Sequence, residues 1–198
     1  MKTTRMTKLV AVASLVLLCG CIFTPRDPDG PPEGDVTDWE TPINTSIVLR
    51  NLEAAFEGEG VQNYRDCFTD SFRFHVDPSD SLEAGQEAEQ KYAYWTRDDE
   101  EHAANGIFAD ASEIALVFTT IQEPDEGTDD TYRIEEYVLT ITFESEGPSE
   151  ESTYEGRASL HMRRDATGRW AIYRWVDRRL PVDDPPTTWG VLRGQYRD

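Results

Sequence analysis

Strict alternation of apolar and polar residues runs through most of the C-terminal half and constrains the fold more than any other feature. Residues 112–121 place Ile114, Leu116 and Phe118 on one side of an extended chain. The same pattern recurs in residues 132–144 with Tyr137, Leu139, Ile141 and Phe143, and in residues 153–164 with Tyr154, Ala158, Leu160 and Met162. A period of two is typical of a β-strand with one buried face. We therefore predict three long strands whose apolar sides share one core.

The connections between these segments contain residues that favour turns. Pro124–Gly127 separates the first two segments, Gly147-Pro148 separates the next two, and Asp165–Gly168 precedes a further extended segment at 169–178. Consecutive strands joined by short turns pair in antiparallel fashion. The sequence therefore predicts an antiparallel meander of four or more strands.

The preceding part of the chain is predicted to be mainly helical. Helical spacing of apolar residues extends from Pro42 to a stop at Gly58, over 61–68, and from Gln86 to about Asn105. A short alternating strand begins at Phe72, with His75 and Asp77 expected on its outward side. Helices first and strands last indicate an α+β fold, with helices covering one face of the sheet.

The order of these elements resembles the cone-shaped fold of the SnoaL-like and nuclear-transport-factor-2-like superfamily over residues 43–194. Short phrases carry the resemblance, namely Tyr64 to Phe72 and Trp170-Ala171-Ile172. The stretches Trp175–Asp177 and Thr188–Gly194 look like the tail of uncharacterised bacterial envelope lipoproteins with such a domain. The resemblance implies a curved antiparallel sheet around a helix, with a pocket at its wide end. Some members use that pocket for isomerisation or hydrolysis, and others only for binding or dimerisation.

The N-terminus resembles a bacterial lipoprotein signal. Lys2, Arg5 and Lys8 precede an apolar run over 9–18, and this run is too short to span a bilayer. Leu18-Cys19-Gly20-Cys21 then fills the four places of a lipoprotein box. The resemblance implies removal of residues 1–20 and a diacylglycerol thioether on Cys21, which would anchor the protein to a membrane. An ordinary secretory signal with two incidental cysteines is the alternative.

Composition divides the remainder into two parts. Residues 21–41 are predicted to be a disordered acidic tether, because proline, glycine and carboxylates leave too little apolar surface to fold. Residues 42–198 have the size of a single domain, and Trp189 and Leu192 predict that its C-terminal tail docks. The expected location is the cell envelope. Ile22 favours the outer membrane, because an Asp there would resemble an inner-membrane retention signal.

The net charge of −20 excludes a general nucleic-acid binder. Loss of the leader, which carries three positive residues and no negative one, would take the charge to −23. The charge is uneven, because residues 157–198 hold nine arginines and five aspartates. We expect these arginines to pair with carboxylates on neighbouring strands, and a dedicated anion site is the alternative.

No residue pattern predicts catalysis, a metal or a cofactor. Neither acidic loop has the spacing of a calcium site, and the sequence has no zinc-protease, paired-cysteine or phosphate-loop motif. The histidines His75, His102 and His161 are expected on surfaces, and the arginines beside His161 should depress its pKa. Cys67 has no His or Lys nearby in the sequence, so we expect a buried packing residue rather than a nucleophile.

Aromatic and arginine side chains are the best candidates for a pocket or a binding surface. They are Tyr64, Trp95, Trp170, Tyr173, Arg174 and Trp175. Trp, Tyr and Arg dominate binding hot spots, although core packing is the simpler explanation for the tryptophans. We hypothesise a non-catalytic binding or assembly module with a protein partner or with a second copy at its exposed sheet face.

A pocket enzyme, an isomerase or hydrolase acting on a small hydrophobic substrate, is the alternative hypothesis. The inner wall of the sheet distinguishes the two. A desolvated carboxylate or His paired with a Tyr or Trp donor would favour the enzyme. A collapsed or wholly apolar wall would favour the binding module.

Overall fold

The computed structural model describes residues 39–83, 92–125, 127–144 and 150–197, all within the compact unit Asp35–Asp198. Its helices and strands are α2 (Thr45–Glu57), α3 (Val61–Asp66), β1 (Phe68–His75), α4 (Pro78–Glu83), α6 (Arg97–Asp110), β2 (Ala111–Gln122), β3 (Asp130–Phe143), β4 (Glu150–Arg164), β5 (Trp170–Arg178) and α7 (Trp189–Gln195). The predicted leader, the lipidation of Cys21 and nearly all of the tether lie outside the described residues and stay predictions. Within those ranges, no helix combines the length and apolarity that a membrane crossing needs.

The five strands form one sheet in the order β1-β5-β4-β3-β2. Strands β2 to β5 make the predicted antiparallel meander, in which Leu116 pairs with Leu139 and Leu139 with Tyr154. These partners are all buried, so the alternation identified the inner face correctly. The structure adds that β1 joins the edge of the meander in parallel to β5, with Phe74 beside Trp175.

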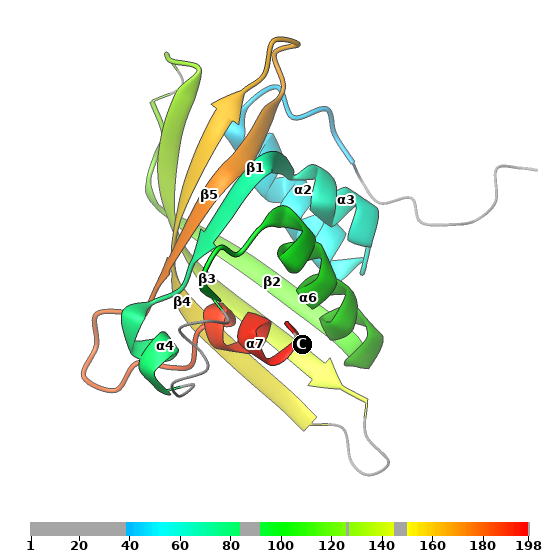
Figure 1. The fold of residues 1–198 in the computed structure, drawn as a ribbon, viewed down its shortest axis with the longest axis vertical. Helices are drawn as coiled ribbons and strands as arrows, with labels where there is room; N and C mark the ends of the chain where they lie inside the picture. The colour runs from blue at the N-terminus through cyan, green and yellow to red at the C-terminus, as the bar shows by residue number, and fades with distance from the viewer. Residues whose placement is uncertain (1–38, 84–91, 126, 145–149, 198) are drawn as a thin grey trace, which may run out of the picture. The chain divides into compact units, whose positions relative to one another are not determined.

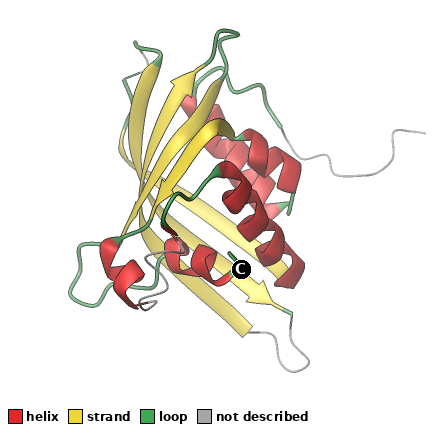
Figure 2. Cartoon of the chain, in the orientation of Figure 1, coloured by secondary structure: helices red, strands yellow, loops and turns green. Residues whose placement is uncertain are grey.

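Helices α2, α3, α6 and α7 lie on one side of the sheet, and the other side is left open (Figure 1, Figure 2). Asn44 begins α2 by accepting a hydrogen bond from the Ile47 amide at 2.9 Å. The buried face of α2 carries Leu52 and Phe56, which join the core against the inner face of the sheet. The predicted α+β architecture, with helices on one face of a curved sheet, is confirmed.

The predicted boundaries around the first strand and at α6 were wrong, because the predicted helix over 61–68 ends at Asp66 as α3 and α6 extends to Asp110. The predicted helix over 86–105 begins outside the described residues, but within them α6 starts only at Arg97. Thr96 and Asp99 form a capping box there, so the acidic residues Asp98, Asp99 and Glu100 lie in the first turn of the helix. Likewise β1 begins at Phe68, four residues before the predicted strand.

Asp77 was expected on the outward side of the first strand, but its side chain is buried. It accepts hydrogen bonds from the backbone amides of Ser79 and Arg179, at 2.8 and 3.2 Å. Strand β1 ends at His75, so the alternation stops before Asp77. The Asp77 carboxylate instead joins the turn into α4 to the end of β5, which satisfies backbone donors at that corner.

Candidate functional site

The inner face of the sheet, where the resemblance placed a pocket, holds a buried polar cluster around Glu100 of α6. Tyr64 of α3 donates from Oη to Glu100 Oε1 at 2.5 Å, and Trp95 donates from Nε1 to Oε2 at 2.8 Å. Arg193 of α7 donates from Nε to Glu100 Oε1 at 2.8 Å. Glu100 and Arg193 are each 1% exposed. The carboxylate is therefore desolvated, but the protein itself supplies its hydrogen-bond donors.

The guanidinium of Arg193 lies among the faces of three aromatic rings. Its Cζ is 4.5 Å from the ring centroid of Phe74, 4.1 Å from that of Trp175 and 4.2 Å from that of Trp189. Ring faces carry negative potential and attract a cation where water is excluded. Burial opposes the charge, but Glu100, with help from Tyr64 and Asp177, raises the pKa of Arg193 above its usual range. Arg193 is thus held as a cation inside the core.

A second buried pair, Tyr137 of β3 and Asp177 of β5, lies on the same inner face. The Tyr137 hydroxyl donates to Asp177 Oδ1 at 2.9 Å and accepts from the Trp189 amide at 2.9 Å. The Gly190 amide donates to Asp177 Oδ2 at 2.8 Å. Burial raises the pKa of Asp177 to about 6, although Arg193, Tyr137 and Gly190 oppose the rise. Burial and the Asp177 charge also raise the pKa of Tyr137 well above its usual value.

The inner face of the sheet therefore meets both the criterion for an enzyme, a desolvated carboxyl with a Tyr or Trp donor, and the criterion for a binding module, a collapsed wall. Glu100 and Asp177 are desolvated carboxyls with Tyr or Trp donors, as an enzyme would need. At the same time, Trp189, Gly190 and Arg193 of α7 occupy the space in front of them and contact both groups directly. A substrate could reach either carboxyl only if α7 moved away.

The six predicted binding residues fall into three places. Tyr64, Trp95 and Trp175 come together around the Glu100–Arg193 ion pair in the core. Trp170 is buried beside a surface cavity at the start of β5. Tyr173 and Arg174 lie on the outer face of the sheet, which the helices do not cover. The residues therefore do not form one pocket.

Sequence reasoning placed Tyr137 on the inner face correctly. It missed the polar role of Tyr137 and the three charged residues of the polar core, Glu100, Asp177 and Arg193. Asp177 could have been suspected, because it follows the buried Trp175 at a spacing of two on β5. Arg193 stands four residues after Trp189, which places both on one side of a helix. Nothing in the sequence distinguishes Glu100 from its acidic neighbours.

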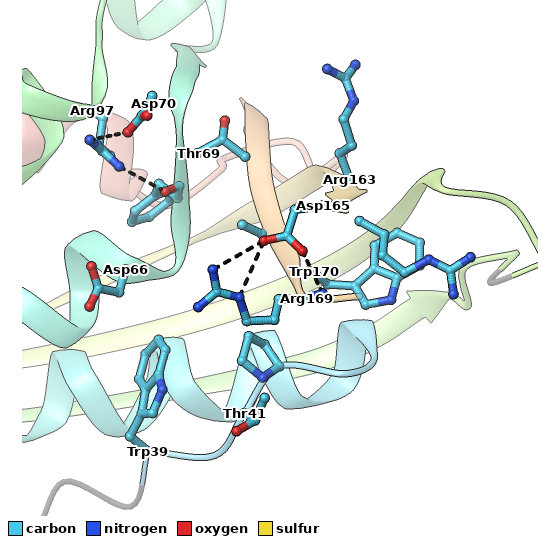
Figure 3. A pocket seen from close by; sticks show the side chains of 14 residues that line it. Trp39, Thr41, Asp66, Thr69, Asp70, Arg97, Arg163, Asp165, Arg169 and Trp170 are labelled. Atoms are coloured by element: carbon cyan, nitrogen blue, oxygen red, sulfur yellow. Dashed lines mark hydrogen bonds and ion pairs between the residues drawn. The ribbon is translucent and has the colours of Figure 1, made fainter. Parts of the chain in front are cut away.

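A surface cavity of about 550 Å³ lies where the segment before α2 passes the turn between β4 and β5 (Figure 3). Four arginines line it, and each has an aspartate partner. The pairs are Arg97–Asp70, Arg163–Asp130, Arg164–Asp129 and Arg169–Asp165. Hydrogen bonds, first from the Thr167 hydroxyl and then from the Arg169 amide, lower the pKa of Asp165 to about 2. Asp165 is therefore a weak base and poorly suited to general-base catalysis.

Cys67, His75 and His161 are also poorly suited to catalysis. Burial raises the pKa of the Cys67 thiol, and the nearby Asp66 carboxylate adds to this, so the reactive thiolate is suppressed. His75 and His161 lie on the outer face, and burial followed by nearby positive charge lowers the pKa of each. The fall at His161 was predicted, but its charged cause is Arg174 rather than Arg157 or Arg163. In the part of the chain that the structure describes, no group of three or more His, Cys, Asp or Glu side chains could hold a metal.

No protein-family model matches the sequence, and no curated protein matches it either. Solved structures share the fold. A conserved protein from Planctomyces limnophilus has a TM-score of 0.54 at 18% identity, over 66% of this chain and 89% of that one. A "putative scytalone dehydratase" from Novosphingobium aromaticivorans has a TM-score of 0.54 at 10% identity, over 73% and 90%.

A third solved structure, a "putative aromatic ring hydroxylase" also from Novosphingobium aromaticivorans, has a TM-score of 0.53 at 15% identity, over 71% of this chain and 89% of that one. These neighbours have the SnoaL-like, nuclear-transport-factor-2-like fold that the resemblance implied. At such identities the likeness shows the fold alone. Enzymes and non-enzymes share this fold, so the function has to be argued from the site.

Proposed function

We propose that this chain is a lipid-anchored protein of the cell envelope that acts as a non-catalytic binding or assembly module. The observation that carries the non-catalytic role is the insertion of α7 against the inner face of the sheet. Trp189 and Arg193 are among the largest fully buried side chains of the protein. A general acid or base must come within hydrogen-bond distance of its substrate. In this protein, α7 occupies the space next to Glu100 and Asp177 that a substrate would need.

Opening this face would be costly. Trp189 packs edge-on against Trp175 at 5.1 Å and against Phe56 at 4.6 Å between ring centroids. Aromatic burial of this kind contributes several kcal/mol per side chain. Withdrawal of α7 would also break the buried ion pair between Glu100 and Arg193. These costs favour α7 as a permanent part of the core.

A neutral hydrophobic dye, N-phenyl-1-naphthylamine, tests whether the inner face accepts small ligands. Wild-type protein is expected to show no saturable binding, whereas Trp189→Ala should bind one dye in the space that the indole leaves. Trp170→Ala is the matched control, because that indole lies beside the surface cavity rather than under α7, and it should not bind. Stoichiometric binding by the wild type would overturn the non-catalytic proposal and support the pocket enzyme.

The lipid anchor is supported by the box Leu18-Cys19-Gly20-Cys21 and the basic leader before it. Mass spectrometry of membrane-extracted protein tests it: we expect a mature N-terminus at Cys21 carrying acyl chains. Cys21→Ala should move the protein from the detergent phase to the aqueous phase, and Cys19→Ala should leave it in the detergent phase. An unacylated mature protein, or a retained leader, would overturn this part of the proposal.

The pocket enzyme remains the second candidate, because Glu100 and Asp177 have the desolvated environment that tunes catalytic carboxyls. It requires α7 to leave during turnover. Hydrogen exchange distinguishes the two functions. The enzyme predicts fast exchange of the Gly190 and Trp189 amides, which bond to Asp177 and Tyr137. The binding module predicts that these two amides exchange as slowly as those of the central strand β4.

A further inference from the structure

Three arginines gather on the open outer face where β1 and β5 meet. Arg73 of β1 and Arg174 of β5 are direct partners across the two parallel strands. Arg178 stands four residues further along β5, opposite Arg157 of β4. All three are exposed. None of the three has an ion pair with a carboxylate of the described residues.

This cluster differs from the other arginines of the C-terminal region. Arg157 pairs with Glu136 at 2.6 Å, and Arg163 pairs with Asp130 at 3.0 Å, as expected for neighbours across a sheet. Arg73 and Arg178 instead donate to the carbonyls of the residues that precede them, at 2.6 and 2.7 Å. Like charges at directly opposed positions destabilise a sheet. In a protein with a net charge of −20, unpaired cations held together indicate a role in binding.

Two histidines complete the cluster. His161 of β4 is the direct partner of Arg174, and His75 of β1 lies two residues beyond Arg73. Burial lowers the pKa of His75, and the titratable groups that face it, Arg174, Arg178 and His161, lower it further. Burial and Arg174 lower the pKa of His161 against the opposing Asp130. The lowered pKa values favour the neutral imidazoles, and an anion that screens the arginines would raise both values.

We propose that Arg73, Arg174 and Arg178, with His75 and His161, form a binding site for a phosphate monoester on a soluble ligand. Arg73, Arg174 and His161 stand in one row across three neighbouring strands, which are about 4.8 Å apart. His75 lies about 6.6 Å further along β1, and Arg178 lies about 13 Å further along β5, so the Arg178 side chain has to reach back along the strand to join the others on one compact anion. A phosphate presents two charges and several acceptor oxygens, which match the fork of donors on each guanidinium. Tyr132, stacked on His161 and 43% exposed, offers a ring for the rest of the ligand.

The surroundings favour a small ligand over an extended anion. Glu136 and Glu155 occupy the outer side of the adjoining strands. Charges are screened over about 8 Å at physiological ionic strength. A compact phosphate therefore meets mainly the arginines, whereas a nucleic acid, an acidic polymer or an anionic bilayer would also meet these carboxylates. The site lies on the outer face of the sheet and goes beyond the proposed function, so it depends neither on the closed inner face nor on the lipid anchor.

An NMR titration of the full chain in detergent tests the proposal. The signals of the imidazole and arginine side chains report on binding. The probes are sulfate, inorganic phosphate and glycerol 3-phosphate, and saturable shifts at His75 and His161 are expected for each. Arg174→Gln and Arg73→Gln should each weaken binding at least tenfold. Arg50→Gln is the matched control, because Arg50 lies on α2 and pairs with Glu40, and it should bind as the wild type does.

The pH dependence gives an independent readout. Sulfate keeps two charges between pH 5.5 and 8, so a change in its affinity reports on the protein. Bound sulfate should raise the pKa of both histidines, and affinity should therefore rise as the pH falls. The double variant His75→Gln/His161→Gln should lose this trend but still bind.

Three results would overturn the site. They are the absence of saturable shifts, equal binding by Arg174→Gln and the wild type, and binding to phosphatidylglycerol vesicles without binding to the soluble probes. Each leaves the test of the lipid anchor unaffected, because that test reads acylation of Cys21. A failed dye test likewise leaves the phosphate site standing, so the two proposals fail separately.

Discussion

Arg193 of the last helix and Glu100 of α6 form an ion pair of 2.8 Å in which the side chains are 1% and 2% exposed. The contact joins two residues that are 93 positions apart. It ties the C-terminal tail to the helix that covers the inner face of the sheet. The last element of the chain is therefore part of the core, and its loss should affect the whole fold.

Replacement of Arg193 by Met should lower the free energy of unfolding by about 3–5 kcal/mol, because Glu100 would remain buried without its cation. Chemical denaturation measures the change. The double variant Arg193→Met/Glu100→Gln should recover part of the loss, since no unpaired charge remains inside.

A surface ion pair serves as the control for that substitution. Arg50 and Glu40 are 3.0 Å apart, and about half of each side chain is exposed. Arg50→Met should therefore cost less than about 1 kcal/mol. Equal costs for the two arginines would show that the Arg193 pair is no more important than a surface contact.

Asp177 should make the protein less stable as the pH rises from 4 to 6. Its pKa is about 6 in the folded protein and about 4 in the unfolded chain. The folded state therefore binds the proton more tightly, and this contribution to stability is complete below pH 4. It falls by up to about 3 kcal/mol as the pH rises to 6, and then stays constant.

Asp177→Asn isolates this contribution, because the amide resembles the protonated carboxyl at every pH. The difference in unfolding free energy between the variant and the wild type should grow in favour of the variant between pH 4 and 6. Denaturant titrations at half-unit intervals measure it. A difference that does not change with pH would contradict the raised pKa.

The elements that could be predicted are those with a long, regular pattern. Alternation over ten or more residues gave the meander and its inner face, because a shift by one residue would expose Leu116, Leu139 and Leu160 together. The arginine pairs with Glu136 and Asp130 also followed, since neighbouring strands bring opposite charges into register.

The parts that could not be predicted depend on contacts between distant residues. The sequence near Glu100 indicates a solvated acidic turn, and only the arrival of Arg193 and Tyr64 makes it a core residue. The parallel pairing of β1 with β5 was not predicted for the same reason, because it joins segments that are about 100 residues apart. The unpaired Arg73 and Arg174 are brought together by that pairing alone.

Gly156→Ala should destabilise the protein by about 1–3 kcal/mol through overpacking. A Cβ at this position would lie 2.4 Å from Tyr137 Oη and 2.9 Å from the Arg178 carbonyl oxygen. Tyr137 cannot swing away without loss of its bonds to Asp177 and the Trp189 amide. Ser159→Ala, on the outer face of the same strand, should change the unfolding free energy by less than about 0.5 kcal/mol. Thermal unfolding of both variants checks the contrast, and an equal, small effect would place Tyr137 in a less restricted environment.

Glu53 and Glu57 of α2 should protect the free edge of the sheet. Glu57 accepts a hydrogen bond from the Leu116 amide at 2.9 Å, and Glu53 accepts one from the Phe118 amide at 3.1 Å. Strand β2 is an edge strand, and unpaired edge amides promote association with other chains. Glu53→Ala/Glu57→Ala should therefore speed hydrogen exchange at Leu116 and Phe118 and increase self-association in light scattering. Glu113→Ala, an exposed position on β2 that receives no such bond, should change neither, and unchanged exchange in the double variant would refute the protective role.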